Sequence, residues 1–174
     1  METKQPKYKR ILLKLSGEAL AEGGEGILNF DFVAKVGEVL KRCLDLGVEI
    51  GVIVGAGNIW RGRQGGKMNR VRADQMGMLA TTIHSLALQD TFVGMGIPAR
   101  VMTAFELNTV ADPFSARHAI EHLENGEIVI FGGGDPLRDE RGEIVGGLGV
   151  SGGSEEEDAA LSAYGRRFFE NEMK

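Results

Sequence analysis

The fold is decided by the stretch Gly51-Val52-Ile53-Val54-Gly55-Ala56-Gly57-Asn58-Ile59-Trp60-Arg61-Gly62. Its first half is a short run of apolar and β-branched residues, which is typical of a buried strand. Its second half contains Gly55 and Gly57, and glycines after a strand let the backbone turn sharply and bring N–H groups close to a ligand. Arg61 adds a planar set of donors suited to phosphate. The stretch predicts an anion site at the carboxyl end of a sheet, with a plain strand-to-helix turn as the alternative.

The glycine spacing matches neither of two common phosphate-binding motifs. A dinucleotide loop requires G-x-G-x-x-G, and the glycine that follows Gly55 and Gly57 is Gly62, two positions too late. A Walker A loop requires G-x-x-x-x-G-K-[ST]. Gly57 and Gly62 have that spacing, but Arg63 and Gln64 follow, so the phosphate-binding lysine and the metal-binding hydroxyl are both absent.

Composition is typical of one α/β domain. The chain has 174 residues, of which 43% are hydrophobic and only 6% aromatic, as in aliphatic cores. Cys43 is the only cysteine, which excludes a disulfide framework, and its helical pattern predicts a buried structural thiol. The charged N-terminus lacks an apolar signal segment, and no apolar run is long enough to span a membrane. We therefore expect a cytoplasmic protein with no membrane contact.

The negative charge is concentrated at the C-terminal end. Residues 1–134 contain 15 basic and 15 acidic side chains, whereas residues 135–174 contain 5 and 10, so the net charge of −5 lies entirely in the last part. Such a step in composition can mark a domain boundary. Because the chain has no basic surplus, we expect no nucleic-acid binding.

The first three predicted elements form a crossover unit. Residues 10–17 are predicted to be a buried strand, interrupted by Lys14, whose side chain must reach the end of the strand or meet an anion. Residues 31–46 have helical periodicity and end at Gly47, and the strand 49–54 follows. A right-handed parallel crossover places Lys14 and the glycines of residues 55–57 at the same edge of the sheet, which favours the phosphate site over a plain turn.

The remaining elements predict a three-layer α/β sandwich with a mainly parallel sheet. The expected strands lie near residues 10–16, 49–54, 98–102 and 127–131, with a loop over 63–72 and helices over 74–95 and 114–123. The helix 74–95 has almost no charge between Asp74 and Asp90, so it should be buried in the core or at a subunit interface. In the C-terminal part we expect a strand near 143–150 and a helix near 155–172, which begins at a Ser154/Glu157 capping box and carries the apolar stripe Leu161, Tyr164 and Phe168.

One short motif has the spacing of a zinc site. His118, Glu121 and His122 match H-x-x-E-H, which puts both histidines on one helix face. No further acidic ligand follows on a suitable helix. We interpret the segment as an exposed helix face opposite Ala119, Ile120 and Leu123, and we assign no metal ligand.

Four segments carry a family likeness: residues 14–20 (KLSGEAL), 55–62 (GAGNIWRG), 68–71 (MNRV) and 74–81 (DQMGMLAT). Their motifs and order closely resemble those of bacterial uridylate kinases of the amino acid kinase superfamily, and the likeness extends from about Tyr8 to Gly134. It implies an enzyme that transfers the γ-phosphate of ATP to UMP with Mg²⁺, giving UDP for pyrimidine nucleotide synthesis. It also implies a homo-oligomer built from dimers, a hexamer in that family, and GTP and UTP as effectors.

The resemblance assigns site roles to Lys14, Leu15, Ser16, Gly17, Ala56, Gly57, Arg61 and Asp74. Lys14 and Arg61 would be catalytic, with Lys14 neutralising the transferring phosphoryl group. The backbone of residues 14–17 would lie near the ATP phosphates, and Gly57 with Arg61 would hold the phosphates between the two nucleotides. Ala56, Gly57 and Asp74 would contact UMP, Asp74 at its ribose. Ala56 replaces a glycine common in the family, which a backbone N–H contact tolerates. Lysine, arginine and amide groups suffice for phosphoryl transfer, because it depends mainly on positioning and charge neutralisation.

The likeness to the kinases ends at Gly134. The family continues there into a Thr-Gly-Asn-Pro-Phe-Phe-Thr-Thr-Asp stretch that grips UMP and supplies a catalytic aspartate, and then into the half that holds ATP, whereas residues 135–138 here are DPLR. Residues 142–158 instead resemble the C-terminal strand and helix of GlcG/HbpS-like domains, some of which bind haem or corrinoid-related ligands. We therefore expect a kinase-like N-terminal part, residues 1–134, joined to a foreign tail, residues 135–174. The alternative function is a non-catalytic nucleotide or anion binder, or a small-ligand binder through the tail.

Overall fold

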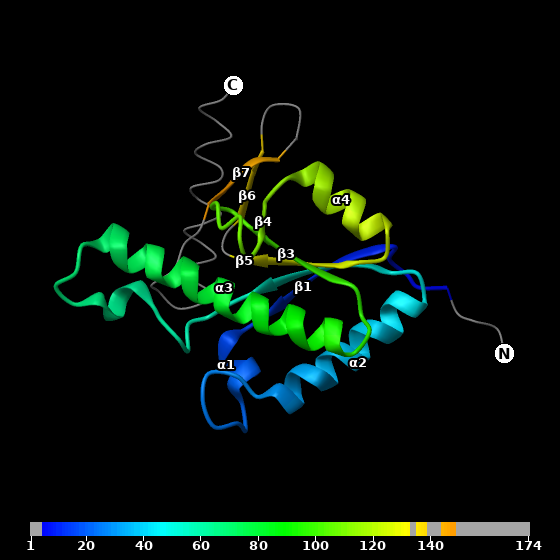
Figure 1. The fold of residues 1–174 in the computed structure, drawn as a ribbon, viewed down its shortest axis with the longest axis horizontal. Coiled ribbons are helices and arrows are strands. Elements are labelled where there is room, and N and C mark those ends of the chain that lie inside the picture. Colours follow the sequence, from blue (N-terminus) through cyan, green and yellow to red (C-terminus); the bar gives the residue numbers. More distant parts are fainter. Residues whose placement is uncertain (1–4, 133–134, 139–143, 149–174) are drawn as a thin grey trace.

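A five-stranded parallel sheet forms the centre of the protein (Figure 1). The computed structural model describes residues 5–132, 135–138 and 144–148. The strand order is β1-β2-β5-β3-β4, and every neighbouring pair is parallel. The strands are β1 (Arg10–Leu15), β2 (Glu49–Val54), β3 (Ala99–Thr103), β4 (Asp112–Pro113) and β5 (Ile128–Gly132). The predicted fold class and the four longer strands are confirmed, and the two-residue β4 was not predicted.

Helices cover both faces of the sheet, which gives the expected three layers. They are α1 (Gly17–Ala21), α2 (Phe30–Asp45), the 3₁₀ turn η1 (Gly62–Gly65), α3 (Arg70–Gly94) and α4 (Ala116–Glu124). In Figure 1, α2 and α3 lie on one side of the sheet and α4 lies on the other. The alternation of β5 follows this arrangement, because Ile128 and Ile130 belong to the α2/α3 core while Val129 packs in the α4 cluster.

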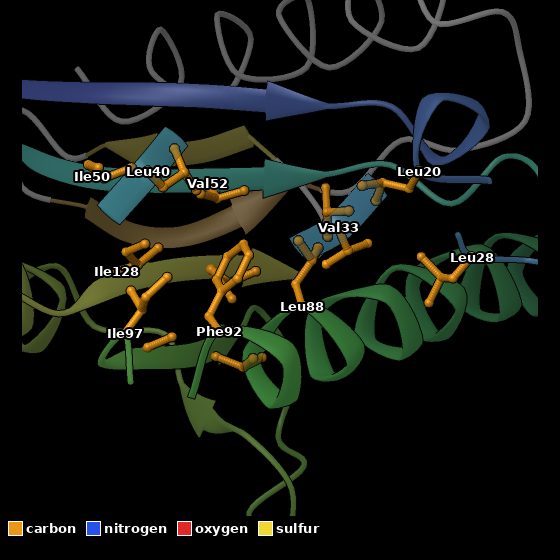
Figure 2. Packing of buried hydrophobic residues seen from close by; sticks show 14 of the residues in the cluster. Leu20, Leu28, Val33, Leu40, Ile50, Val52, Leu88, Phe92, Ile97 and Ile128 are labelled. Atoms are coloured by element: carbon orange, nitrogen blue, oxygen red, sulfur yellow. The ribbon is translucent and has the colours of Figure 1, made fainter. Parts of the chain in front are cut away.

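The larger core lies between the sheet and the helices α2 and α3 (Figure 2). Phe92 of α3 is completely buried there, together with Val33 of α2 and Ile50 and Val52 of β2. Cys43 is partly buried against this core, which agrees with a structural thiol. Burial of these aliphatic and aromatic side chains is the main favourable term that holds the layers together.

Helix ends agree with the sequence signals at several positions. The side chain of Asn29 accepts from the N–H of Phe32 at the start of α2, and that of Ser115 accepts from His118 at the start of α4. Gly47 follows α2 with a φ of 80°, a left-handed conformation that glycine adopts without strain. Helix α1 was not predicted; the side chain of Ser16 caps it by accepting from the N–H of Ala19.

Two sequence predictions about local structure were wrong. The segment 63–72 is not all loop, because it contains part of η1 and the first turn of α3, which begins at Arg70 rather than Asp74. Asn69 caps that turn by accepting from the N–H of Val71. Strand β1 is not uniformly buried: it lies at one end of the strand order, and Leu12 is 63% exposed. A terminal strand with one helix-covered face alternates in burial, as β1 does.

The surface of α3 carries a stripe of exposed apolar side chains, which we call the α3 stripe: Met76, Leu79 and Ile83, exposed by 37%, 46% and 47%. They are spaced by three and four residues and so share one helix face. The opposite face packs into the core through Leu88 and Phe92. This long apolar helix is therefore partly buried by its own domain and partly left exposed, and a subunit interface on the exposed face stays a prediction.

The described part of the tail forms a separate hairpin-like pair. Strand β6 (Asp135–Arg138) pairs with β7 (Ile144–Leu148) in antiparallel fashion, so a strand lies where one was predicted near 143–150. The predicted helix near 155–172, its capping box and its apolar stripe lie outside the described residues. Within the ranges that the structure covers, none of the helices has the length and apolar character needed to cross a membrane.

Candidate functional site

The ends of β1 and β2 meet at one edge of the sheet. Lys14 pairs with Ile53 and Leu15 with Val54 in the parallel register. The pairing is continued by the N–H of Gly55, which donates to the carbonyl of Leu15 over 2.8 Å. The crossover therefore brings Lys14 and the glycine loop to the same carboxyl edge, where ligands bind in open α/β sheets.

Gly17 allows the two segments to pack against each other closely. A Cβ atom built on Gly17 would lie 2.8 Å from the carbonyl oxygen of Gly55 and 3.0 Å from the Cα of Ala56. It would also lie 2.3 Å from the side-chain oxygen of Asn58. Real Cβ atoms essentially never lie closer than 3.0 Å to another heavy atom, so only glycine permits this approach of the backbone after β1 to the loop after β2.

The loop after β2 closes as a single helical turn. The N–H groups of Ile59 and Trp60 both donate to the carbonyl of Ala56, over 3.0 and 3.1 Å. The first N–H groups of such a turn have no partner inside it, and they can face an anion. In the part of the chain that the structure describes, the N–H groups of Ala56 and Gly57 have no backbone acceptor.

A tryptophan ties this loop to the start of α3. The indole N–H of Trp60 donates to the carbonyl of Ala73 over 2.8 Å. Ala73 is buried and immediately precedes Asp74, which is half-buried. The predicted UMP-binding carboxylate therefore follows directly on the peptide that anchors the glycine loop.

Arg61 lies folded back over the loop. Its Nε donates to the carbonyl of Gly57 over 3.2 Å, and its Nη2 forms an ion pair with the carboxylate of Glu18. Burial raises the pKa of Glu18, but its own backbone N–H, the guanidinium of Arg61 and the hydroxyl of Ser16 outweigh this effect and leave the pKa lowered. Glu18 is thus a charged partner that holds Arg61 beside Gly57, and a phosphate that binds Arg61 has to compete with it.

The sequence analysis did not identify two side chains, Asn58 and His84, that connect the loop after β2 to other segments. Asn58 donates from Nδ2 to the carbonyl of Ile27 over 2.8 Å. His84 of α3 has no exposed surface, and its Nδ1 lies 2.8 Å from the carbonyl oxygen of Gly55. Its Nε2 lies 3.2 Å from the carbonyl oxygen of Ile27. The contact with Gly55 spans 29 sequence positions, and no local pattern predicts it.

The zinc-like motif has other partners in the structure. Nδ1 of His122 lies 3.3 Å from a carboxylate oxygen of Glu127, and Arg117 lies 3.7 Å from the carboxylate of Glu121. His118 is exposed. Among the described residues, no group of three or more His, Cys, Asp or Glu side chains is arranged to hold a metal ion. Ile120, which we expected on the buried face, is 41% exposed.

Comparison with solved structures finds the same fold in known enzymes. The UMP kinase from Bacillus anthracis is 40% identical, with a TM-score of 0.68, over 74% of this chain and 54% of that chain. The UMP kinase from Ureaplasma parvum is 28% identical, with a TM-score of 0.66, over 73% and 55%. This chain therefore spans about half the length of those enzymes, and the expected likeness to uridylate kinases is confirmed.

A family comparison gives a second result for the later part. Residues 71–167, more than half of the chain, match the family described as haem degrading protein HbpS-like, and the chain belongs to this family. The likeness to HbpS-like proteins expected from residues 142–158 is confirmed, and the match begins much earlier, inside α3. Elements α3 to β5 thus lie both in the HbpS-like match and in the kinase-like sheet.

Proposed function

We propose that this chain is a phosphate-binding protein of the nucleoside monophosphate kinase type, with UMP and ATP as its nucleotides. The observation that carries the proposal is the packing of Gly17 against Gly55 and Ala56, which brings two backbone segments and Lys14 to one edge of a parallel sheet. The likeness to two UMP kinases supports the choice of nucleotides.

Each residue of the site then has a role that its place in the fold supports. Lys14 lies at the end of β1 and neutralises the phosphoryl group in transfer. The backbone at Leu15, Ser16 and Gly17 holds the ATP phosphates. We expect Mg²⁺ to arrive with ATP, bound to the phosphate oxygens, as is usual for this ion.

The other side of the site is the glycine loop. Ala56 and Gly57 offer backbone N–H groups to the phosphate of UMP, and Asp74 accepts from its ribose. Arg61 completes the phosphate site by exchanging the carboxylate of Glu18 for phosphate, since both are bound by the same planar donors.

We expect turnover to be weak or absent. In the resembled family, a UMP-gripping segment and an ATP-binding half follow the position of Gly134, and the sequence here departs from that pattern. Loss of positioning can cost many orders of magnitude in rate, so nucleotide binding can survive when turnover does not.

A coupled assay for ADP formation with UMP, ATP and Mg²⁺, alongside calorimetric binding of each nucleotide, tests the proposal. Lys14→Ala should abolish turnover where it occurs and weaken ATP binding, while Lys35→Ala, an exposed lysine on α2, should change neither. Binding without turnover would support the non-catalytic alternative. Absence of both binding and turnover in the unaltered chain would contradict a nucleotide site.

The second candidate is a small-ligand binder of the HbpS-like kind, and the match over residues 71–167 favours it. Among the described histidines, only His118 is exposed. His84 is enclosed between two carbonyl groups, His122 faces Glu127, and a cavity of about 330 Å³ at the amino edge of the sheet is lined by no histidine. Titration with haemin, followed by its absorbance band, tests this candidate directly.

A further inference from the structure

His84 connects three segments that meet behind the glycine loop. It belongs to α3, it is completely buried, and its two ring nitrogens lie against the carbonyl oxygens of Gly55 and Ile27 at 2.8 and 3.2 Å. Ile27 lies in the segment between α1 and α2, and its carbonyl also accepts from Asn58. One imidazole therefore joins the loop after β2 to the segment before α2.

In both contacts only the histidine can be the hydrogen-bond donor. A carbonyl oxygen can only accept a hydrogen bond, so each contact requires a proton on the ring nitrogen that faces it. A neutral imidazole has one N–H and can serve one carbonyl, whereas a protonated ring serves both. The shorter contact, from Nδ1 to Gly55, is the one that reaches the proposed phosphate site.

The Gly55 carbonyl controls the direction of the next N–H group. The described residues contain no cis peptide bond, so the C=O of Gly55 and the N–H of Ala56 point in opposite directions within one plane. Because His84 holds the oxygen toward α3, the N–H of Ala56 points away from α3. The preceding peptide is fixed as well, since the N–H of Gly55 donates to Leu15.

We propose that His84 is a positioning residue for the phosphate site: by donating to the Gly55 carbonyl, it orients the Ala56 N–H toward the bound phosphate. This inference rests on the proposed function. His84 does not touch the nucleotide; it acts through the peptide between Gly55 and Ala56. The contact with Ile27 is made by the other ring nitrogen and does not involve the Ala56 peptide.

Two substitutions separate the two contacts. In His84→Asn, the side-chain amide nitrogen can take the place of Nδ1 and donate to Gly55, while the contact with Ile27 is lost. In His84→Gln, the amide nitrogen can take the place of Nε2 and donate to Ile27, while the contact with Gly55 is lost. Gln89→Leu is the matched control, because Gln89 is also on α3 and donates to a backbone carbonyl, that of Ala99 at the start of β3.

Calorimetric titration of the full chain with UMP, whose phosphate the Ala56 N–H is proposed to bind, gives the first measurement. His84→Gln should weaken binding about tenfold, the order expected when one orienting hydrogen bond is lost, whereas His84→Asn and Gln89→Leu should stay within about twofold of the unaltered chain. Equal weakening by the Asn and Gln variants, with equal losses of thermal stability, would show a merely structural role and overturn the inference. Unchanged binding in His84→Gln would also overturn it.

The amide resonance of Ala56 in a ¹H–¹⁵N spectrum gives a measurement that needs no ligand. It should shift in His84→Gln and stay close to its original position in His84→Asn. If the unaltered chain does not bind UMP, the proposed function fails, but this shift still decides whether His84 orients the loop. An Ala56 resonance that is unchanged in both variants would refute the positioning role.

Discussion

Substitution of Gly17 by alanine should disrupt the contact between the two phosphate-site segments. The added Cβ would lie 2.8 Å from the backbone oxygen of Gly55 and 3.0 Å from the Cα of Ala56. The side chain of Asn58, at 2.3 Å, can rotate away, but the backbone atoms can yield only if a whole segment moves. The alanine can therefore be accommodated only if the backbone of the loop after β2 shifts.

The magnitude follows from the effect of adding atoms to a well-packed site. Overpacking usually lowers the free energy of unfolding by about 1–3 kcal/mol. Because the added Cβ meets backbone atoms, which cannot rotate away, we expect a loss of about 2 kcal/mol for Gly17→Ala. For a chain of this size, such a change lowers the melting temperature by roughly 4–8 °C. Because the glycine loop is displaced, UMP binding should also weaken.

Thermal unfolding followed by circular dichroism measures the change, and Gly94→Ala provides the control. Gly94 also lies in a helix, is exposed, and has nothing within 4 Å of a Cβ built on it. Alanine there should leave stability unchanged or raise it by up to about 1 kcal/mol, because glycine is a poor helix former. If Gly17→Ala melts at the same temperature as the unaltered chain, the close packing of the two segments is refuted.

Two further predictions concern the surface and the amino edge of the sheet. The α3 stripe should form a two-fold subunit contact, so Leu79→Glu should convert an oligomer to a folded monomer in sedimentation at tens of micromolar. The control, Ile120→Glu on the exposed face of α4, should leave the oligomer intact. An unaltered chain that is already monomeric would contradict this prediction. Burial raises the pKa of Glu49, but Lys9 and Arg10, at 3.1 and 2.5 Å, outweigh it and lower the pKa below 4.5. The stabilisation by this carboxylate is therefore complete above that pH and is lost as the pH falls through the lowered pKa. Glu49→Gln should cost on the order of 1 kcal/mol at pH 7, and progressively less as the pH falls below 4.5, as measured by urea unfolding. A difference that stays constant across this pH range would refute it.

The sequence predicted the strands and α2 because their signals are local. β2 is apolar after its first residue, Glu49, and α2 has both helical periodicity and a glycine at its end. Helix α1 has only five residues, too few for a periodic pattern, and depends on its Ser16 cap. The first turn of α3, Arg-Val-Arg, lacks apolar periodicity, so only the cap at Asn69 marks the true start.

For the candidate site, the placement of its residues at one sheet edge was predictable, but their interaction partners were not. The crossover rule places Lys14 and Gly57 at one edge from sequence alone. The partners of the site residues were not predictable, because they are distant in the chain. Glu18 pairs with Arg61 across 43 positions, and His84 reaches Ile27 across 57. Such contacts depend on the relative placement of whole elements, which periodicity and spacing do not determine.

The order of the strands has a consequence for how the chain folds as it is synthesised. Val129 of β5 pairs with Gly51 on one side and with Arg100 on the other, so the last strand of the sheet lies between two that are made earlier. Until β5 has left the ribosome, β2 and β3 each have an unpaired edge that can join with another chain. Pairing over such long sequence separations is also slow, because a large loop must close first. Folding of the sheet therefore has to wait for β5, and aggregation should compete with it most strongly in nascent chains that end just before residue 128.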